Sequence, residues 1–124
     1  MSAQTVSPKP SAVTLFKTTA LVIGVGTPAY TSPDIDASQA SNLMLCVSSG
    51  TIVGSPSLQW YLYGKDPNGH YAVLNAGTTA MVTASTVWYP LVTAGLILPA
   101  TVQLQAVNAP ASSGFTVDIA LVGR

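Results

Sequence analysis

Few side chains in this sequence are of the types that perform chemistry. The chain has one histidine, His70, and one cysteine, Cys46, whereas a zinc site needs several such ligands. Asp34 and Asp36 are separated by one residue and form a possible calcium or magnesium pair. In an extended segment, however, their side chains point to opposite sides. We therefore interpret Asp36 as the cap of a short turn, and we predict neither a metal site nor a cofactor site.

Catalysis by a nucleophile needs a base beside it, and His70 has no serine or cysteine partner in a recognised motif. The sequence also lacks the GxSxG, P-loop and HExxH patterns. We interpret His70 as an exposed residue at the start of a strand. Cys46 lies inside a predicted strand and is interpreted as a small buried side chain, with an intersubunit disulfide as the alternative. The protein is therefore predicted not to be an enzyme.

Aromatic residues gather in the middle of the sequence, where they indicate either a sugar-binding platform or a core together with a contact surface. Trp60 alternates in register with Leu58 and Leu62, which places it in the predicted core. The opposite side of that strand carries tyrosines and a glutamine, a mixture that suits a contact surface. The residues that we expect at an interface are Lys9, Pro10, Tyr61, Tyr63, Trp88 and Tyr89.

Charged residues are unusually scarce. Lysine and arginine number 4, aspartate and glutamate number 4, and the formal net charge is zero. Only 6% of the chain is charged, whereas a typical domain has about 25%. Nucleic-acid binding is not expected, because phosphate contacts need clustered basic residues. No apolar stretch approaches the ~18 residues of a membrane helix, so no membrane partner is expected either.

The shortage of charge also bears on self-association. Soluble β-proteins protect their sheet edges with lysine, proline and bulges, and this chain has only three lysines. Some predicted strands carry apolar residues on both faces, as Val22 does beside Leu21 and Ile23. A lone domain would expose apolar patches, which commonly mark interfaces. We therefore expect a homo-oligomer in which the folded domains contact one another.

Apolar and polar residues alternate along most of the chain, the pattern of half-buried strands. The clearest strands are predicted at 43–47, 58–63, 101–106 and 115–121. Further strands are predicted at 13–19, 20–25, 70–75, 80–83 and 86–92. Strands at spacings of roughly 8 to 12 residues are typical of a sandwich. The predicted fold class is all-β: one antiparallel β-sandwich or jelly-roll-like domain at 11–124, after an extended N-terminal arm at 1–10.

Turn chemistry separates the predicted strands. Lys65–His70 contains proline, asparagine and glycine in an order that predicts a hairpin, and Ala84-Ser85 predicts a shorter one. Ser38–Asn42 is predicted to form one helical turn.

Two stretches resemble small virion proteins of tailed bacteriophages. Residues 32–47, SPDIDASQASNLMLCV, are similar to the segment ADIDVSGYSSLTLQV of those proteins. Residues 58–74, LQWYLYGKDPNGHYAVL, are similar to their hairpin LxVxLxGKDPASGKYYxL. The resemblance covers nearly the whole chain from Val13 onward. It implies a β-sandwich structural component of the virion, of the kind that decorates and cements the head.

From this resemblance we expect a capsid decoration (cement) protein that binds the major capsid protein on the outer surface of the phage head. The arm at Met1–Pro10 would strap a neighbouring subunit, and the resemblance favours a trimer over a dimer. Synthesis in the host cytoplasm is expected, because Met1–Pro10 lacks the apolar core of a secretory signal and the one cysteine is unpaired within the chain.

Two alternatives stay open at the level of the sequence. One is a virion protein of the tail, neck or fibre, with Tyr61, Tyr63, Trp88 and Tyr89 in contact with a receptor. The other is a carbohydrate-binding β-sandwich unrelated to a virus, which would be a monomer with affinity for glycans. Copy number on the particle would distinguish head from tail, and a glycan array would test the carbohydrate-binding module.

Overall fold

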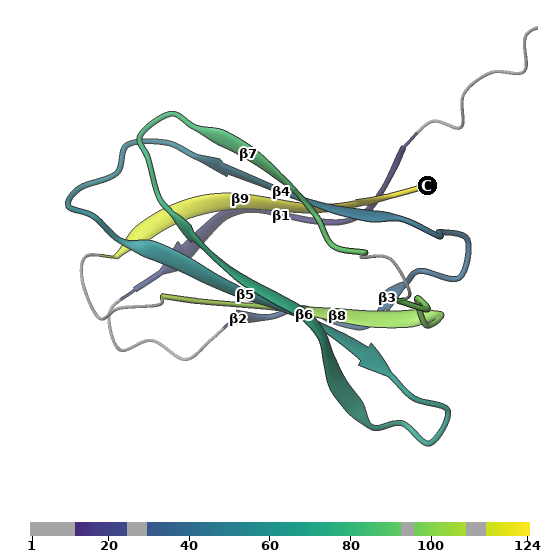
Figure 1. Ribbon diagram of the computed structural model, residues 1–124. Coiled ribbons are helices and arrows are strands. Elements are labelled where there is room, and N and C mark those ends of the chain that lie inside the picture. Colours follow the sequence, from purple (N-terminus) through teal and green to yellow (C-terminus); the bar gives the residue numbers. More distant parts are fainter. Residues whose placement is uncertain (1–11, 25–29, 93–95, 109–113) are drawn as a thin grey trace, which may run out of the picture.

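The computed structural model describes residues 12–24, 30–92, 96–108 and 114–124. They form two β-sheets packed face to face (Figure 1), which confirms the predicted β-sandwich. Within these ranges, no helix is long and apolar enough to span a membrane. The arm predicted at 1–10 lies outside the described residues.

The first sheet has the strand order β1-β9-β4-β7. Its strands are β1 (Val13–Ile23), β9 (Phe115–Gly123), β4 (Leu43–Ser49) and β7 (Thr86–Pro90). The second sheet has the order β2-β8-β5-β6, and a further short strand, β3, also pairs with β8. Its strands are β2 (Tyr30–Thr31), β3 (Ile35–Asp36), β5 (Ser57–Lys65), β6 (Tyr71–Ala80) and β8 (Thr101–Asn108).

The strand pairing is nested: β1 pairs with β9, β2 with β8, β4 with β7 and β5 with β6. All these pairs are antiparallel. Nesting of this kind arises when one long antiparallel hairpin is rolled up. Successive strand pairs along the hairpin are then divided between the two sheets. The sandwich therefore has the double-sheet topology of a jelly roll.

The core lies between the sheets, where the strands turn their alternate apolar residues inward. The leucines with at most 2% exposure are Leu43, Leu45, Leu58, Leu62, Leu91, Leu104 and Leu121. Trp60 is 5% exposed, which confirms its predicted place in the core. Gly77 on β6 lies opposite Trp60, and a β-carbon there would come within 2.4 Å of the indole ring. The size of the tryptophan thus requires glycine at position 77.

β1 is one strand where the alternation predicts two, at 13–19 and 20–25. Its register along β9 shifts between Thr14 and Phe16 and again between Thr18 and Leu21. In the second shift, Ala20 has a φ of 53° and its N–H donates to the Asp118 carboxylate at 2.7 Å. Such bulges interrupt the alternation of side chains without ending the strand, which is why the pattern indicates a break.

Four further predictions are wrong in detail. The strand predicted at 80–83 does not form, because β6 ends at Ala80, and β7 ends at Pro90 before the predicted end at 92. The turn at Ala84 exists, but it joins β6 and β7, which lie in different sheets, so no hairpin forms there. At Ser38–Asn42 there is a turn without a helix, in which the Asp36 carboxylate accepts the Ser38 N–H at 2.9 Å.

The hairpin predicted at Lys65–His70 is confirmed and joins β5 to β6. Asp66 Oδ1 accepts the backbone N–H groups of Asn68 and His70, each at 2.8 Å. Gly69 has a φ of 87°, a conformation that glycine adopts without steric cost. This short turn sets the register of the β5–β6 pair from Lys65 to Tyr63, beyond which the register shifts between Tyr63 and Leu62.

Candidate interaction surfaces

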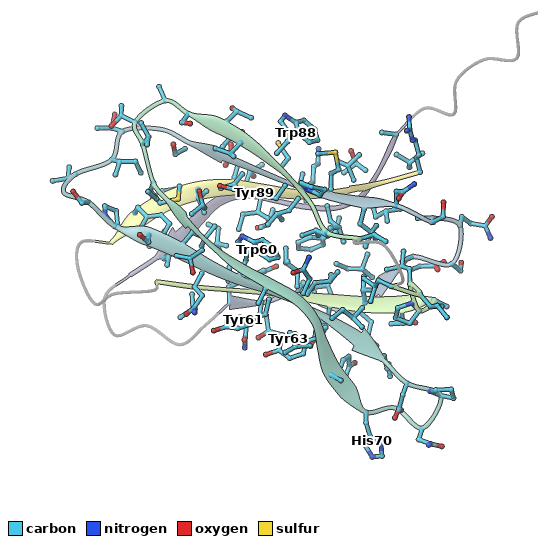
Figure 2. All side chains as sticks on the ribbon, in the orientation of Figure 1. Trp60, Tyr61, Tyr63, His70, Trp88 and Tyr89 are labelled. Carbon is cyan, nitrogen blue, oxygen red and sulfur yellow. The ribbon has the colours of Figure 1, made fainter. Side chains whose placement is uncertain are left out.

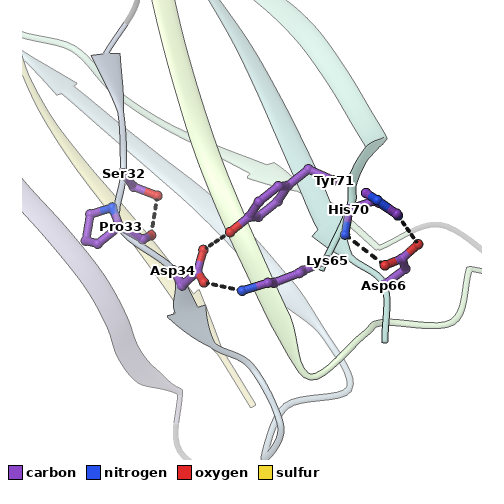
Figure 3. A network of polar contacts seen from close by, with 7 residues as sticks. All are labelled: Ser32, Pro33, Asp34, Lys65, Asp66, His70 and Tyr71. Carbon is purple, nitrogen blue, oxygen red and sulfur yellow. Dashed lines mark hydrogen bonds and ion pairs between the residues drawn. The ribbon is translucent and has the colours of Figure 1, made fainter. Parts of the chain in front are cut away.

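The described residues contain no group of three or more His, Cys, Asp and Glu side chains that could hold a metal ion. His70 is exposed at the hairpin, and its Nδ1 lies 3.5 Å from the carboxylate of Asp66 (Figure 3). Cys46 is half-buried rather than fully buried, since it lies on the outer side of β4. What the chain does build is two outer faces of different chemistry.

Asp34 and Asp36, the possible cation pair, have separate partners. Asp34 accepts hydrogen bonds from Lys65 Nζ at 3.0 Å and from the Tyr71 hydroxyl (Figure 3). These two bonds hold the pKa of Asp34 below its ordinary value of 3.8, and the bond from Tyr71 has the larger effect. Asp36 bonds to Ser38, which lowers the pKa of Asp36 as well. The Asp34 bonds tie the segment after β2 to the β5–β6 hairpin.

One end of the outer face of the first sheet is apolar. The β4 register places Met44 between Pro90 on β7 and Val122 on β9. Trp88 on β7 points away from the sandwich (Figure 2) and is 51% exposed. Beside it, on the same side of the sheet, lies Cys46. We call the surface made by Met44, Trp88, Pro90 and Val122 the Trp88 face.

Some polar groups near the Trp88 face are bonded within the protein. The hydroxyls of Ser48 and Thr86 lie 3.0 Å apart, and Asp118 accepts the Ala20 N–H. A groove of about 460 Å³ opens at the start of β4, and its walls include Met44, Trp88 and Val122 together with the polar Asn42 and the charged Arg124. The face therefore offers an apolar surface beside a recess that has a polar end.

The outer face of the second sheet is aromatic and polar. Tyr61 and Tyr63 on β5 have ring centres 6.3 Å apart, with their planes at 38° (Figure 2). On β8, Gln105 lies opposite Tyr61 and Gln103 opposite Tyr63. The Tyr63 hydroxyl donates to Gln105 Oε1 at 3.1 Å. We call the surface made by Gln59, Tyr61, Tyr63, Gln103 and Gln105 the tyrosine face.

The structure separates the aromatic residues that the sequence placed together at an interface. Tyr61 and Tyr63 lie on one outer face and Trp88 on the other. Tyr89 lies on neither outer face. Its ring centre is 6.0 Å from that of Trp60, and its hydroxyl bonds to Thr79. Neighbouring residues of a strand point to opposite sides, so Tyr89 packs between the sheets while Trp88 faces outward.

The remaining interface predictions, Lys9 and Pro10, lie outside the described residues. Val122 is among the apolar residues that the sequence places on the second face of a strand, whereas Met44 was not predicted as part of a surface. The signal for Met44 was present in the sequence, since it alternates with the inward-facing Leu43 and Leu45 and so must face outward.

No protein-family model matches the sequence, and no curated protein matches it. Among solved structures, the fold is similar to the crystal structure of the SPBc2 prophage-derived protein YomS, with a TM-score of 0.50. The two chains share 17% sequence identity, and the match covers 97% of this chain and 100% of that one. The similarity shows a common fold.

Proposed function

We propose that this chain is a non-enzymatic structural protein of a bacteriophage particle, and more specifically a decoration protein that binds the major capsid protein on the outer surface of the head. The exposed Trp88, on the edge strand β7 beside the apolar Met44 and Val122, is the observation that carries the attachment. The phage setting is supported by the fold shared with a prophage-derived protein and by the resemblance at 32–47 and 58–74.

The Trp88 face has the chemistry of a protein contact. Tryptophan is enriched among the residues that dominate binding energy at interfaces, where it is surrounded by side chains that exclude water. Here Met44, Pro90 and Val122 form such a surround, on strands held by backbone pairing. The neighbouring groove can receive a side chain of the capsid protein.

The lack of charge fits attachment by packing. With 6% charged residues and no net charge, the chain has little capacity for electrostatic steering, so buried apolar area must supply the affinity. Many copies on one shell would add modest contacts into a substantial stabilisation of the head. We propose that copies also contact one another as a homo-oligomer, with a trimer favoured over a dimer by the resemblance, and that Met1–Pro10 straps a neighbouring subunit.

Head stability tests this function. Phage particles from which the gene for this chain has been deleted are compared, with and without added full-length protein, for survival of heat and of chelators. We expect added protein to restore resistance and to be present in numbers comparable to the capsid protein. Unchanged resistance would exclude the cement role. If each particle carried only enough copies to form a single ring, the protein would belong to the tail or neck instead of the head.

The arm and the oligomer have their own tests. Deletion of 1–10 should leave the sandwich folded and weaken attachment to the particle, and full occupancy without the arm would exclude a strap. Light scattering of the full-length protein should give the mass of an oligomer, and a monomer at high concentration would refute self-association.

A further inference from the structure

The geometry points to a second binding site on the side of the sandwich opposite to the Trp88 face: we infer that the tyrosine face binds a neutral oligosaccharide. This site goes beyond the proposed attachment to a capsid, uses different residues and does not depend on it.

Two aromatic rings provide a surface for the apolar faces of sugar rings. Tyr61 and Tyr63 are half-buried on β5, and both point away from the sandwich (Figure 2). Their centres are 6.3 Å apart with a tilt of 38°, so the two rings form a shallow angled platform rather than one stack. Tyrosine combines such an apolar face with a polar hydroxyl, which suits a ligand that is itself part apolar and part hydroxylated.

Unpaired polar groups surround this platform. In the described part of the chain, the amides of Gln59 and Gln103 and the hydroxyl of Tyr61 have no hydrogen-bond partner. Each glutamine amide offers two N–H donors and a carbonyl acceptor, the complement of a sugar hydroxyl, which both donates and accepts. A ligand can therefore bond to these groups without breaking an internal hydrogen bond. Around the Trp88 face, by contrast, Ser48 and Thr86 are bonded to each other.

The charge of the site selects a neutral ligand. No charged residue occurs between 57 and 64 or between 101 and 108. The nearest cation along β5 is Lys65, which pairs with Asp34 at 3.0 Å. Single-stranded nucleic acid also stacks on aromatic rings, but it needs a positively charged groove as well. An anionic sugar polymer would lack a cationic partner in the same way.

The platform is held in place before a ligand arrives. β5 is an interior strand, paired with β6 on one side and β8 on the other, so the backbone beneath both tyrosines is fixed by two neighbours. The Tyr63 hydroxyl is held by Gln105, and the amide of Gln105 lies 3.5 Å from the Thr31 hydroxyl. Such preorganisation reduces the entropy that binding must overcome.

An NMR titration of the isotope-labelled full-length protein tests this site. The probes are maltohexaose, cellohexaose, chitohexaose and mannohexaose at millimolar concentration, with polygalacturonate as an anionic probe. We expect at least one neutral oligosaccharide to shift the amide signals of β5 and β8 around Tyr61 and Gln103. Tyr61→Ala should weaken that binding by about tenfold or more, whereas Tyr61→Phe should retain most of it.

Trp88→Ala is the matched control, since it removes an aromatic ring from the other outer face. The inference is overturned if no neutral probe shifts β5 and β8, if only polygalacturonate binds, or if binding survives Tyr61→Ala in a protein whose spectrum shows it is folded. Particle attachment is measured separately on the same variants. If Trp88→Ala loses attachment to the particle while its sugar binding is unchanged, the two faces are independent binding sites.

Discussion

The two outer faces carry their aromatic rings at different places in the sheets. Tyr61 and Tyr63 lie on β5, which has a neighbour on each side, whereas Trp88 lies on β7 at the edge of the first sheet, next to the interior strand β4. On the Trp88 face, Met44 and Trp88 lie near Ser48 and Thr86, whose hydroxyls bond to each other. On the tyrosine face, the rings lie near the amides of Gln59 and Gln103, which have no hydrogen-bond partner within the described residues. Aromatic residues alone therefore do not specify a partner. The pairing of the polar groups beside them decides whether a surface suits packing or hydrogen bonding.

The largest effect should come from placing a charge on the Trp88 face. Trp88→Glu should reduce binding to gene-deleted particles by about thirtyfold or more, since loss of a tryptophan that dominates an interface costs about 2 kcal/mol or more. Sedimentation of particles with labelled protein measures it. Val73→Glu is the matched control, because Val73 lies on β6 in the second sheet and is, like Trp88, 51% exposed. An equal loss of particle binding in both variants would contradict attachment through the Trp88 face.

The core beneath both faces should be sensitive at Gly77. Gly77→Ala places a β-carbon 2.4 Å from the Trp60 ring, and such overpacking should lower the free energy of unfolding by about 1–3 kcal/mol. Urea denaturation followed by tryptophan fluorescence measures the change. Gly50→Ala is the control, because nothing lies within 4 Å of its added carbon. If the two variants were equally stable, the account of packing around Trp60 would be wrong.

The hairpin that extends the tyrosine-face sheet should depend on Asp66. Asp66→Ala removes the acceptor of two backbone N–H groups and should lower the free energy of unfolding by about 1 kcal/mol, as loss of a helix cap does. Asp66→Asn keeps a side-chain oxygen and should recover most of the loss. Thermal unfolding compares the three proteins, and binding to particles should be the same in all of them. A loss of attachment would show that the hairpin, and not the Trp88 face alone, contacts the shell.

The smallest effect is expected from pH at Asp34. Because the pKa of Asp34 in the folded protein lies below 3.8, its contribution to stability is complete above that value and is lost as the pH falls through the lower folded-state value. A carboxyl NMR titration should therefore give a midpoint below 3.8. Lys65→Met should move the midpoint upward. A midpoint at or above 3.8 in the unaltered protein would mean that the contacts to Tyr71 and Lys65 do not form in solution.

The strands with uninterrupted alternation were predictable, and the elements without it were not. Leu58 to Tyr63 alternates regularly and forms the middle of β5. β1 was divided in two because the bulge at Ala20 shifts the alternation, and this bulge is stabilised by Asp118, which is 98 residues away. β2 and β3 have two residues each, too few to show a period.

The candidate surfaces were predictable only in part, for a related reason. Alternation shows that Trp88 and Tyr89 point to opposite sides, but both are aromatic, and the sequence does not say which side is the inner one. The answer depends on Trp60 and Thr79, which pack against Tyr89 from the second sheet. The amides of the tyrosine face come from β5 and β8, which are brought together only by the rolled topology.

Attachment to a phage head through the Trp88 face is the main proposal for this chain. Electron microscopy of gene-deleted particles, after addition of the full-length protein, shows where the protein binds and which face it uses. We expect density for the sandwich at equivalent positions over the outer surface of the head, with Met44 and Trp88 against the capsid protein. Density confined to the tail or neck, absence from the particle, or attachment through the tyrosine face would contradict it.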